Sequence, residues 1–283
     1  MTDLYRAQGV LDRNVVKNKK IACFGFGSLG SLLGGDLLAY DWGAILLADP
    51  QNLERENIER HLLGASEIGK PKVEGGKRWL VSHGVPADHI LTHVGNAQDV
   101  LKWCEEADLI IVTIDSRRAC RDINAWCVDH NKPAIYGGVY PMGTGGQVIV
   151  VPNPKEACFA CAEHMMGSDQ FQDLQAHDYG IDIARLADEL GGAQNAIPAL
   201  RWSISAIASD MADIALSILT GKGGEEAPHV LIHAHNWESI LNLRAKSAGL
   251  TSVANFIAQM PKLKLLPNMK LRWLPGDGVY ELL

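Results

Sequence analysis

The sequence lacks the features of membrane-spanning, secreted and fibrous proteins. Its 283 residues hold no apolar run long enough to cross a bilayer, since Ser and Asp interrupt even the stretch 206–218. The N-terminal letters MTDLYRAQG carry charge early and have no apolar core, so we expect no signal peptide and no membrane partner. Six cysteines in a chain of this length do not form a disulfide framework, which favours a reducing, cytoplasmic compartment.

Strong charge of either sign is also missing. The 26 Lys and Arg residues stand against 33 Asp and Glu, for a formal net charge of -7. Non-specific binding of nucleic acid needs a broad basic surface that neutralises phosphates, so we expect no nucleic-acid partner. With 47% hydrophobic and 21% charged residues, the composition is that of an ordinary globular protein with a substantial core.

A strand, a glycine turn and a helix are the first elements that the pattern predicts. Residues 21–24 form a short apolar run, GFGSLG follows, and leucines at helical spacing continue to Leu38. A second apolar strand at 44–48 ends at Asp49. Two strands joined by one helix predict a right-handed parallel unit.

Strands and helices keep alternating through the first half. We expect strands at 90–94, 108–113 and 134–137; helices at 73–83, 99–106 and 119–131; and a loop with short helical pieces at 51–72. This order is typical of an open α/β sheet.

The second half departs from that alternation. A strand at 143–151 is followed by a polar connection at 165–195 and by a long apolar helix at 197–219, with Pro198 in its first turn. Further strands are expected at 230–235 and 241–246, with a short edge element in the C-terminal tail. The predicted fold class is therefore α/β: a Rossmann-like open sheet whose parallel first half is extended by later antiparallel strands, with a long crossing loop.

The glycine turn predicts a nucleotide site. Gly25, Gly27 and Gly30 form GxGxxG between a strand and a helix, where backbone and phosphate approach closely. Asp49 ends the next strand, where a carboxylate can accept hydrogen bonds from ribose hydroxyls. The pattern does not identify the nucleotide, and such glycines also serve tight strand–helix packing alone.

The segment after Asp49 gathers polar and cationic residues. Asn57, Arg60 and His61 lie in NLERENIERH, and Lys70 and Lys72 lie in GKPKVE. Fixed cations of this kind stabilise the charge that develops when ATP is cleaved between its α- and β-phosphates. The alternative is a solvated charged loop, which the neighbouring glutamates favour.

A further carboxylate follows a buried strand. Asp115 lies directly after the predicted strand at 108–113, at the carboxyl edge where ligands bind in such sheets. A carboxylate in this position can hold Mg²⁺ against phosphates, or it can cap the next helix. Arg117, Arg118 and Arg121 come next and are open to substrate, phosphate or solvent contacts.

Taken together, these motifs resemble those of the ThiF/MoeB/HesA superfamily, the nucleotide-binding fold shared with ubiquitin-activating enzymes. The matching stretches run from about residue 6 to about residue 245, and the sequence is most similar to bacterial ThiF-type domains. In chain order they are GFGSLGS, LLADPQNLERENIERH, IGKPKVE, ADLIIVTIDSRRACRDIN, KPAIYGGVYPMGTGGQVIVV, CFACAEH, IPALRWSISAIASDMADIALSILTG and LIHAHNWE.

The resemblance implies ATP-dependent adenylation of a C-terminal carboxylate, giving an acyl-adenylate and pyrophosphate. The substrate is expected to be a small β-grasp carrier protein, ubiquitin-like or sulfur-carrying, or else a precursor peptide. The implied site has the glycines at the phosphate turn, Asp49 at the ribose and Asp115 at Mg²⁺. The residues implied to contact the phosphates are Asn57, Arg60 and Lys72.

The resemblance also implies an organisation. Residues 1–283 would form a single adenylation domain, with a nucleotide-binding half at 20–140 and a substrate-binding and dimer half at 141–283. A homodimer is expected, in which an N-terminal arginine of one subunit completes the site of the other. Arg6 is the first candidate for that arginine and Arg13 the second.

Two features of the cysteines depart from the family pattern. Cys158 and Cys161 match the first of two CxxC pairs that hold structural Zn²⁺ in many members, but Cys161 is the last cysteine of the chain. His164, His233 and His235 are candidate replacement ligands, and two buried thiols without metal are the alternative. Residues 165–195 hold no acyl-accepting cysteine.

The remaining cysteines lie in predicted strands and helices, where a buried thiol is expected. They are Cys23, Cys104, Cys120 and Cys127. We therefore expect direct transfer of the acyl group to an external nucleophile: a thiol, a sulfide source or an amine.

Two other functions stay open at this stage. An NAD(P)-dependent oxidoreductase on a Rossmann fold rests on the glycines and Asp49 alone. A non-catalytic scaffold, which supports the active site of a partner, has little need for the full set of matched cations.

Overall fold

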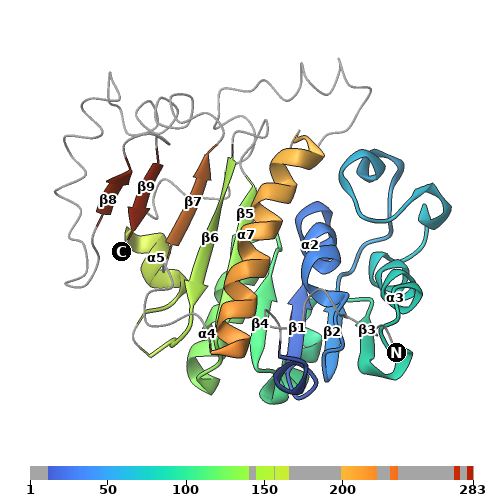
Figure 1. Ribbon diagram of the computed structural model, residues 1–283, viewed down its shortest axis with the longest axis horizontal. Helices are drawn as coiled ribbons and strands as arrows, with labels where there is room; N and C mark the ends of the chain where they lie inside the picture. The colour runs from blue at the N-terminus through green and yellow to red at the C-terminus, as the bar shows by residue number, and fades with distance from the viewer. Residues whose placement is uncertain are drawn as a thin grey trace.

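A seven-stranded sheet forms the centre of the computed structural model, which describes residues 12–139, 145–155, 157–165, 199–221, 230–234, 271–274 and 279–282. The strand order is β3-β2-β1-β4-β5-β6-β7 (Figure 1). The strands are β1 (Lys20–Phe24), β2 (Ala44–Ala48), β3 (Ile90–His93), β4 (Leu109–Val112), β5 (Ala134–Val139), β6 (Gly145–Val151) and β7 (Val230–Ala234). Strands β1 to β5 pair in parallel, whereas β6 and β7 are antiparallel, which confirms the predicted fold class.

One face of the sheet is covered by three helical elements (Figure 1). Helix α2 (Ser28–Leu33) continues as a π-helical turn, η2 (Gly34–Leu38), and packs beside the long helix α7 (Arg201–Thr220). Helix α3 (Lys72–Ser82) lies against β2 and β3. By length and composition α7 would also suit a membrane span, but Ile207, Met211 and Ala215 are fully buried in the core against the sheet.

The opposite face carries its own apolar cluster. Helix α4 (Arg117–His130), the 3₁₀ helix η6 (Ala97–Glu106) and the short helix α5 (Phe159–Met165) pack there. Phe24 and Ile110 of the sheet meet Ile123 and Cys127 of α4 in this cluster. Strands β1, β2 and β4 are thus buried on both faces, which explains why their sequences are almost wholly apolar.

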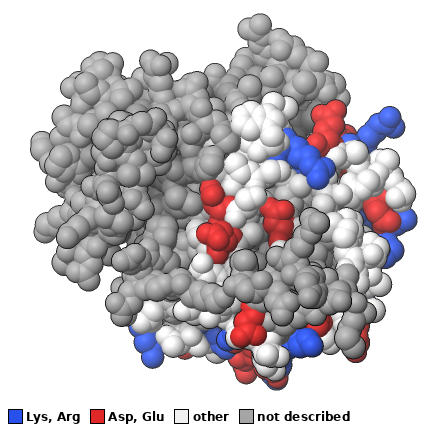
Figure 2. Space-filling model, viewed as in Figure 1, with Lys and Arg blue, Asp and Glu red and all other residues white. Residues whose placement is uncertain are grey.

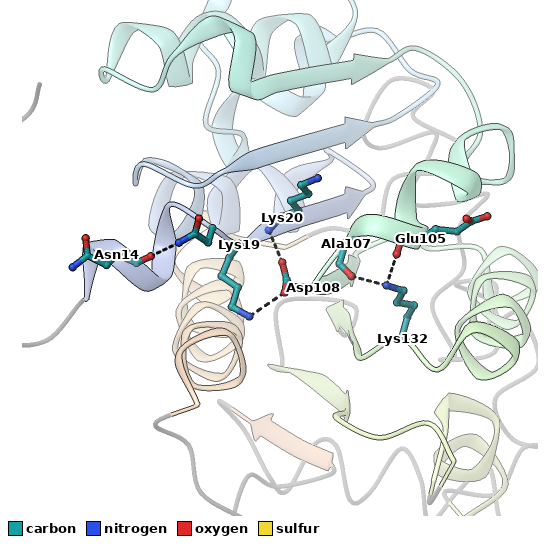
Figure 3. A network of polar contacts seen from close by, with 8 residues as sticks. Asn14, Lys19, Lys20, Glu105, Ala107, Asp108 and Lys132 are labelled. Atoms are coloured by element: carbon teal, nitrogen blue, oxygen red, sulfur yellow. Dashed lines mark hydrogen bonds and ion pairs between the residues drawn. The ribbon is translucent and has the colours of Figure 1, made fainter.

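Polar contacts fix the edge of the sheet where β1 and β4 begin (Figure 3). The Asp108 carboxylate accepts hydrogen bonds from Lys19 Nζ at 3.0 Å and from the backbone nitrogen of Lys20 at 2.8 Å. Lys132, just before β5, donates from Nζ to the carbonyl oxygen of Ala107 at 3.2 Å. The strands are therefore tied at the edge opposite to the one where Asp49 and Asp115 follow β2 and β4.

The remaining elements lie in connections or outside the main sheet. Short helices η3 (Arg55–Arg60) and η4 (Ala65–Glu67) confirm the predicted helical pieces between β2 and α3, and η5 (Ala87–His89) precedes β3. A four-residue helix, α1 (Arg13–Val16), precedes β1. Strands β8 (Leu271–Leu274) and β9 (Val279–Leu282) form a separate antiparallel pair.

Three expectations differ from the structure. Helix α7 begins at Arg201 rather than 197, because Leu200 has an extended backbone (ψ 145°), so Pro198 precedes the helix and is not in its first turn. The expected helix at 99–106 is a 3₁₀ helix, and α5 was not anticipated. The crossing loop predicted at 165–195 lies, apart from its first residue, outside the described residues, and the strand predicted at 241–246 lies wholly outside them.

Candidate functional site

The glycine turn after β1 uses each of its three glycines for a different reason. Gly25 has φ +89°, and an added Cβ would lie 2.8 Å from the carbonyl oxygen of Thr113. A Cβ at Gly30 would lie 2.2 Å from the carbonyl oxygen of Gly25, because α2 starts pressed against the turn. A Cβ at Gly27 would meet nothing within 4 Å, so packing does not require this glycine. Open space at the middle glycine is what close approach of a phosphate needs.

Asp49 is held directly against this turn. Its Oδ2 accepts a hydrogen bond from the backbone nitrogen of Phe26 at 2.6 Å, and its Oδ1 accepts one from Gln51 at 2.8 Å. The residue is 6% exposed. Each carboxylate oxygen keeps a further lone pair, so Asp49 can still accept from a ligand hydroxyl.

His61 ties the loop after β2 to the same turn. Its Nδ1 accepts from the backbone nitrogen of Leu63 at 3.1 Å, so in the neutral ring Nε2 carries the proton and donates to the Phe26 carbonyl oxygen at 2.9 Å. Burial is the main cause that lowers the pKa of His61 to about 4; the cations of Lys72 and Arg201 act in the same direction, whereas the hydrogen bond to Phe26 and the charge of Asp49 oppose it. The ring is therefore neutral at physiological pH, and its two hydrogen bonds hold the loop after β2 against the glycine turn.

Lys72 is 4% exposed and is held by one residue at both ends. Its backbone nitrogen donates to the carbonyl oxygen of Gln51 at 3.0 Å, and its Nζ donates to Gln51 Oε1 at 2.6 Å. This arrangement turns the start of α3 toward the end of β2 and therefore toward Asp49. Gln51 carries no charge, and the positive charge of Lys72 acts on the nearby Asp115 carboxyl group.

Asp115 shares one electrostatic environment with these groups. Crowding by protein atoms raises the pKa of the Asp115 carboxyl, Arg60 and Lys72 lower it, and Asp49 raises it again. The side chain nevertheless remains reachable by solvent. Arg60, Lys72 and Asp49 therefore lie close enough to Asp115 for their charges to act on its carboxyl group.

The structure assigns the cap of helix α4 to a residue other than Asp115. Ser116, not Asp115, is the N-cap of α4, since its hydroxyl oxygen accepts from the backbone nitrogen of Ala119 at 3.3 Å. Asp115 is therefore not needed as a cap. Arg117 and Arg121 pair with Glu163 of α5, at 2.6 and 2.8 Å, so these two arginines join helices instead of reaching the glycine turn.

Other predicted residues are placed differently. Asn57 is half-buried in η3, and its Oδ1 accepts from the backbone nitrogen of Glu54 at 3.1 Å, which closes a helix cap. Arg13 lies in α1, and Arg6 lies outside the described residues. The roles assigned to Asn57 and Arg6 stay predictions.

Zinc was predicted at the cysteine pair, and the described residues supply only half of a site. Cys158 and Cys161 lie at the start of α5 with their sulfur atoms 3.5 Å apart. Within the part of the chain that the structure describes, no three His, Cys, Asp or Glu side chains gather as a metal site, whereas structural zinc takes four ligands. The side chains of His164 and His233, and all of His235, lie outside the described residues.

Some contacts of the site were not found from the sequence. The NIERH motif pointed to His61 but not to its bond with Phe26, which lies 35 residues earlier. Arg201 at the start of α7 donates to the His61 carbonyl oxygen at 2.9 Å, a contact across 140 residues. Gln51 carries no charge and has no assigned role in the stretch LLADPQNLERENIERH, so no sequence signal indicated its hold on Lys72.

Comparison with known proteins assigns this chain to a family. Residues 3–249 match the model of the ThiF family. The chain belongs to the ThiF family. Among curated ThiF-like relatives, the ubiquitin-like modifier-activating enzyme 5 of Drosophila virilis is 27% identical over 202 residues, covering 66% of this chain and 50% of that protein. The same enzyme of Caenorhabditis briggsae is 24% identical over 196 residues, covering 65% and 45%.

Solved structures show the same ThiF-type fold. E. coli MccB with AMPCPP and MccA has a TM-score of 0.57 at 20% identity, covering 79% of this chain and 65% of the other. PaaA has a TM-score of 0.56 at 20% identity, covering 80% and 63%. This chain spans about half the length of the curated relatives it matches.

Proposed function

We propose that this chain uses ATP to adenylate the C-terminal carboxylate of a ubiquitin-like or sulfur-carrier protein, or of a peptide. The single observation that carries the proposal is the convergence of Arg60, Lys72 and Asp49 on Asp115 beside the glycine turn. Membership of the ThiF family supports it. So does the likeness to MccB, which has been solved with ATP and with MccA.

The proposed reaction is a displacement at phosphorus. An oxygen of the substrate carboxylate attacks the α-phosphate of ATP, a new oxygen–phosphorus bond forms, and the bond to the β-phosphate breaks. The products are an acyl-adenylate and pyrophosphate. Negative charge grows on the α-phosphate and on the leaving group, and Arg60 and Lys72 are the cations that stabilise it. No protein atom becomes covalently bonded, so catalysis consists of positioning and charge stabilisation.

The nucleotide is held by the turn and by Asp49. The phosphates approach the backbone at Gly27, where an added side chain would have met open space. The free lone pairs of Asp49 accept from the ribose hydroxyls, while its two backbone hydrogen bonds keep the carboxylate in place. This use of Asp49 and the glycines is common to nucleotide-binding sheets.

Asp115 is the proposed Mg²⁺ ligand. Mg²⁺ in nucleotide enzymes takes one or two carboxylates together with phosphate oxygens and water, so a single accessible carboxylate among phosphate-binding residues fits it. Asp115 would hold the ion there, and the ion would supply positive charge to neutralise the phosphates. The proposed reaction needs no zinc at Cys158 and Cys161.

The acyl group is proposed to pass directly to an external nucleophile. Burial raises the pKa of Cys23, Cys104, Cys120 and Cys127 to about 12, so these thiols stay protonated and shielded. A nucleophilic cysteine needs the opposite environment.

The proposed active unit is a homodimer in the cytoplasm, with Arg6 of one subunit completing the site of the other. The family resemblance supports the dimer, and the six unpaired cysteines fit a reducing compartment. Within each subunit we keep the division into a nucleotide-binding half at 20–140 and a substrate and dimer half at 141–283.

The test is exchange of labelled pyrophosphate into ATP. The chain is incubated with Mg-ATP and with candidate carriers ending in Gly-Gly, or with candidate precursor peptides. We expect exchange that depends on one such substrate. Exchange with carriers only, or with peptides only, identifies the substrate class. Nucleotide binding without exchange for any candidate favours a scaffold, and selective binding of NADH over ATP favours an oxidoreductase.

A further inference from the structure

Two of the six cysteines are placed to react with one another. Cys158 and Cys161 are three residues apart at the start of α5, and their sulfur atoms lie 3.5 Å from each other within hydrogen-bond contact. Cys161 is exposed and Cys158 is half-buried, so solvent molecules reach the pair. A disulfide bond is about 2.0 Å long, so a shift of about 1.5 Å between the sulfurs joins them.

The surroundings of Cys158 supply hydrogen bonds to its sulfur atom. They come from the backbone of Cys161, from the Asn124 side chain and from the backbone of Ala160. Asn124 is fixed in turn, because its Oδ1 accepts from the backbone nitrogen of Phe159 at 2.9 Å. The thiolate is the reactive form in thiol–disulfide exchange.

The other four cysteines provide an internal contrast. Cys23, Cys104, Cys120 and Cys127 are all buried, and burial raises the pKa of each to about 12. Thiols of that kind react slowly with reagents in solution. All six cysteines of the chain lie within the described residues, so Cys158 and Cys161 are set apart from every other thiol that the chain contains.

The helix that carries the pair is anchored. Glu163 of α5 is 2% exposed and pairs with both Arg117 and Arg121 of α4. The partly exposed thiols therefore lie on a firmly held element, which keeps the two sulfur atoms facing each other.

We propose that Cys158 and Cys161 form a redox-active dithiol that closes to an intrachain disulfide by exchange with a small disulfide of the glutathione type. The Cys158 thiolate attacks one sulfur of the external disulfide, which breaks, and a mixed disulfide forms as the first external thiolate leaves. Cys161 gives up its proton and attacks the Cys158 sulfur, and the second external thiolate leaves. Two electrons pass from the protein to the external disulfide, which is reduced to two thiols. The proposal does not depend on the adenylation chemistry.

The first experiment needs no variant. The folded, reduced chain is treated with an alkylating reagent and then digested, and the labelled cysteines are identified by mass spectrometry. We expect rapid labelling of Cys158 and Cys161 and slow labelling of the other four. Equal labelling of all six in the folded chain would overturn the proposal, and a chain unfolded in denaturant gives the reference value.

The second experiment tests the disulfide itself. After incubation with glutathione disulfide, the peptide that contains both cysteines should lose two hydrogens, and dithiothreitol should restore them. Cys161→Ser should stop at a mixed disulfide of Cys158 with glutathione, whereas the double substitution to serine should not react. A wild-type peptide that keeps both hydrogens contradicts the proposal. The proposal is also contradicted if each chain binds one zinc ion tightly and if Cys158→Ser and Cys161→Ser each abolish that binding.

Discussion

The Nε2 of His61 donates a hydrogen bond to the carbonyl oxygen of Phe26 at 2.9 Å, inside the turn that carries the glycines. His61 directly follows Arg60, so this bond fixes the backbone beside the cation that the proposed reaction needs. We therefore assign His61 as a positioning residue. It acts on the nucleotide through Arg60 and the turn and makes no proposed contact of its own.

Replacing His61 by alanine should weaken both the fold and nucleotide binding. The Phe26 carbonyl and the Leu63 amide would lose their partners in a buried place, at a cost of about 2–3 kcal/mol in the free energy of unfolding. Urea denaturation measures this loss, and the KM for ATP in pyrophosphate exchange should rise. His61→Gln, which keeps a donor, should recover part of both. Equal KM values for wild type and His61→Ala would contradict the positioning role.

Stability should also depend on pH through this residue. The pKa of His61 is about 4 in the folded chain against an ordinary value of 6.5, so the unfolded chain binds the extra proton first as the pH falls. The stability that this neutral histidine contributes is complete above pH 6.5 and declines between there and pH 4, by up to about 3 kcal/mol. Urea midpoints across that window measure the decline. His61→Gln should flatten it, and an unchanged slope would refute the assignment.

Two glycines of the same turn should respond in opposite ways to alanine. Gly27→Ala places a methyl group in open space, so we expect the free energy of unfolding to change by less than about 1 kcal/mol while ATP affinity falls at least about tenfold. Gly30→Ala places the methyl 2.2 Å from the carbonyl oxygen of Gly25, so the fold itself should lose about 3 kcal/mol. Thermal melting and ATP titration separate the two effects. Normal ATP binding by Gly27→Ala would show that the phosphates lie elsewhere.

Lys72 and Lys70 offer a matched pair of cations. Lys72→Met keeps the buried stem and removes the charge, so we expect kcat/KM for exchange to fall by about 10²–10³-fold with the fold intact. Lys70 is about half exposed and pairs with Glu67, so Lys70→Met should change the rate by no more than a few-fold. If both variants lose activity equally, the loss comes from the general surface charge, and this result would contradict a specific role of Lys72 in stabilising the phosphates.

Asp115 should be required for magnesium-dependent chemistry but not for folding. Asp115→Asn keeps the shape and removes the charge, so exchange should fall by at least about 100-fold while the melting temperature stays close to that of wild type. The matched control is Asp129→Asn, an exposed carboxylate in the α4 helix that follows Asp115. Calorimetry of ATP with and without Mg²⁺ gives an independent readout. Retained Mg²⁺ dependence in Asp115→Asn would remove this residue from the metal site.

Local patterns predicted most of the described sheet. The run at Ala44–Ala48 became β2 with the expected bounds because Gly43 and Asp49 end it on both sides. The predicted first helix changes to π-helical geometry at Gly34, and the apolar spacing of the sequence does not reveal this change. Helix α5 was missed because FACAEHM shows no apolar periodicity, and its bonds to α4 come from residues some 40 positions away.

The charged residues of the candidate site could be predicted from the sequence, but the residues that hold them in place could not. Asp49, Lys72 and Asp115 follow strands or a loop at motif spacing, so their neighbourhood could be inferred. The supports depend on chain folding: Gln51 holds Lys72, and Arg201 reaches His61 from the far half of the sequence. Contacts of this kind have no local signature.

The surface in Figure 2 shows acidic and basic side chains interspersed over its described part, in line with the small net charge.

Helix α7 supplies much of one side of the core although it is encoded after residue 200. Its contacts with α2, β5 and β6 mean that Leu33, Leu37 and their neighbours stay uncovered on the growing polypeptide until Thr220 has left the ribosome. A fragment that stops near residue 140 should therefore aggregate when expressed alone, whatever its affinity for nucleotide. We expect chaperones to bind this exposed apolar surface of α2 and η2 during synthesis. Cells that lack chaperones should therefore accumulate the chain in insoluble form.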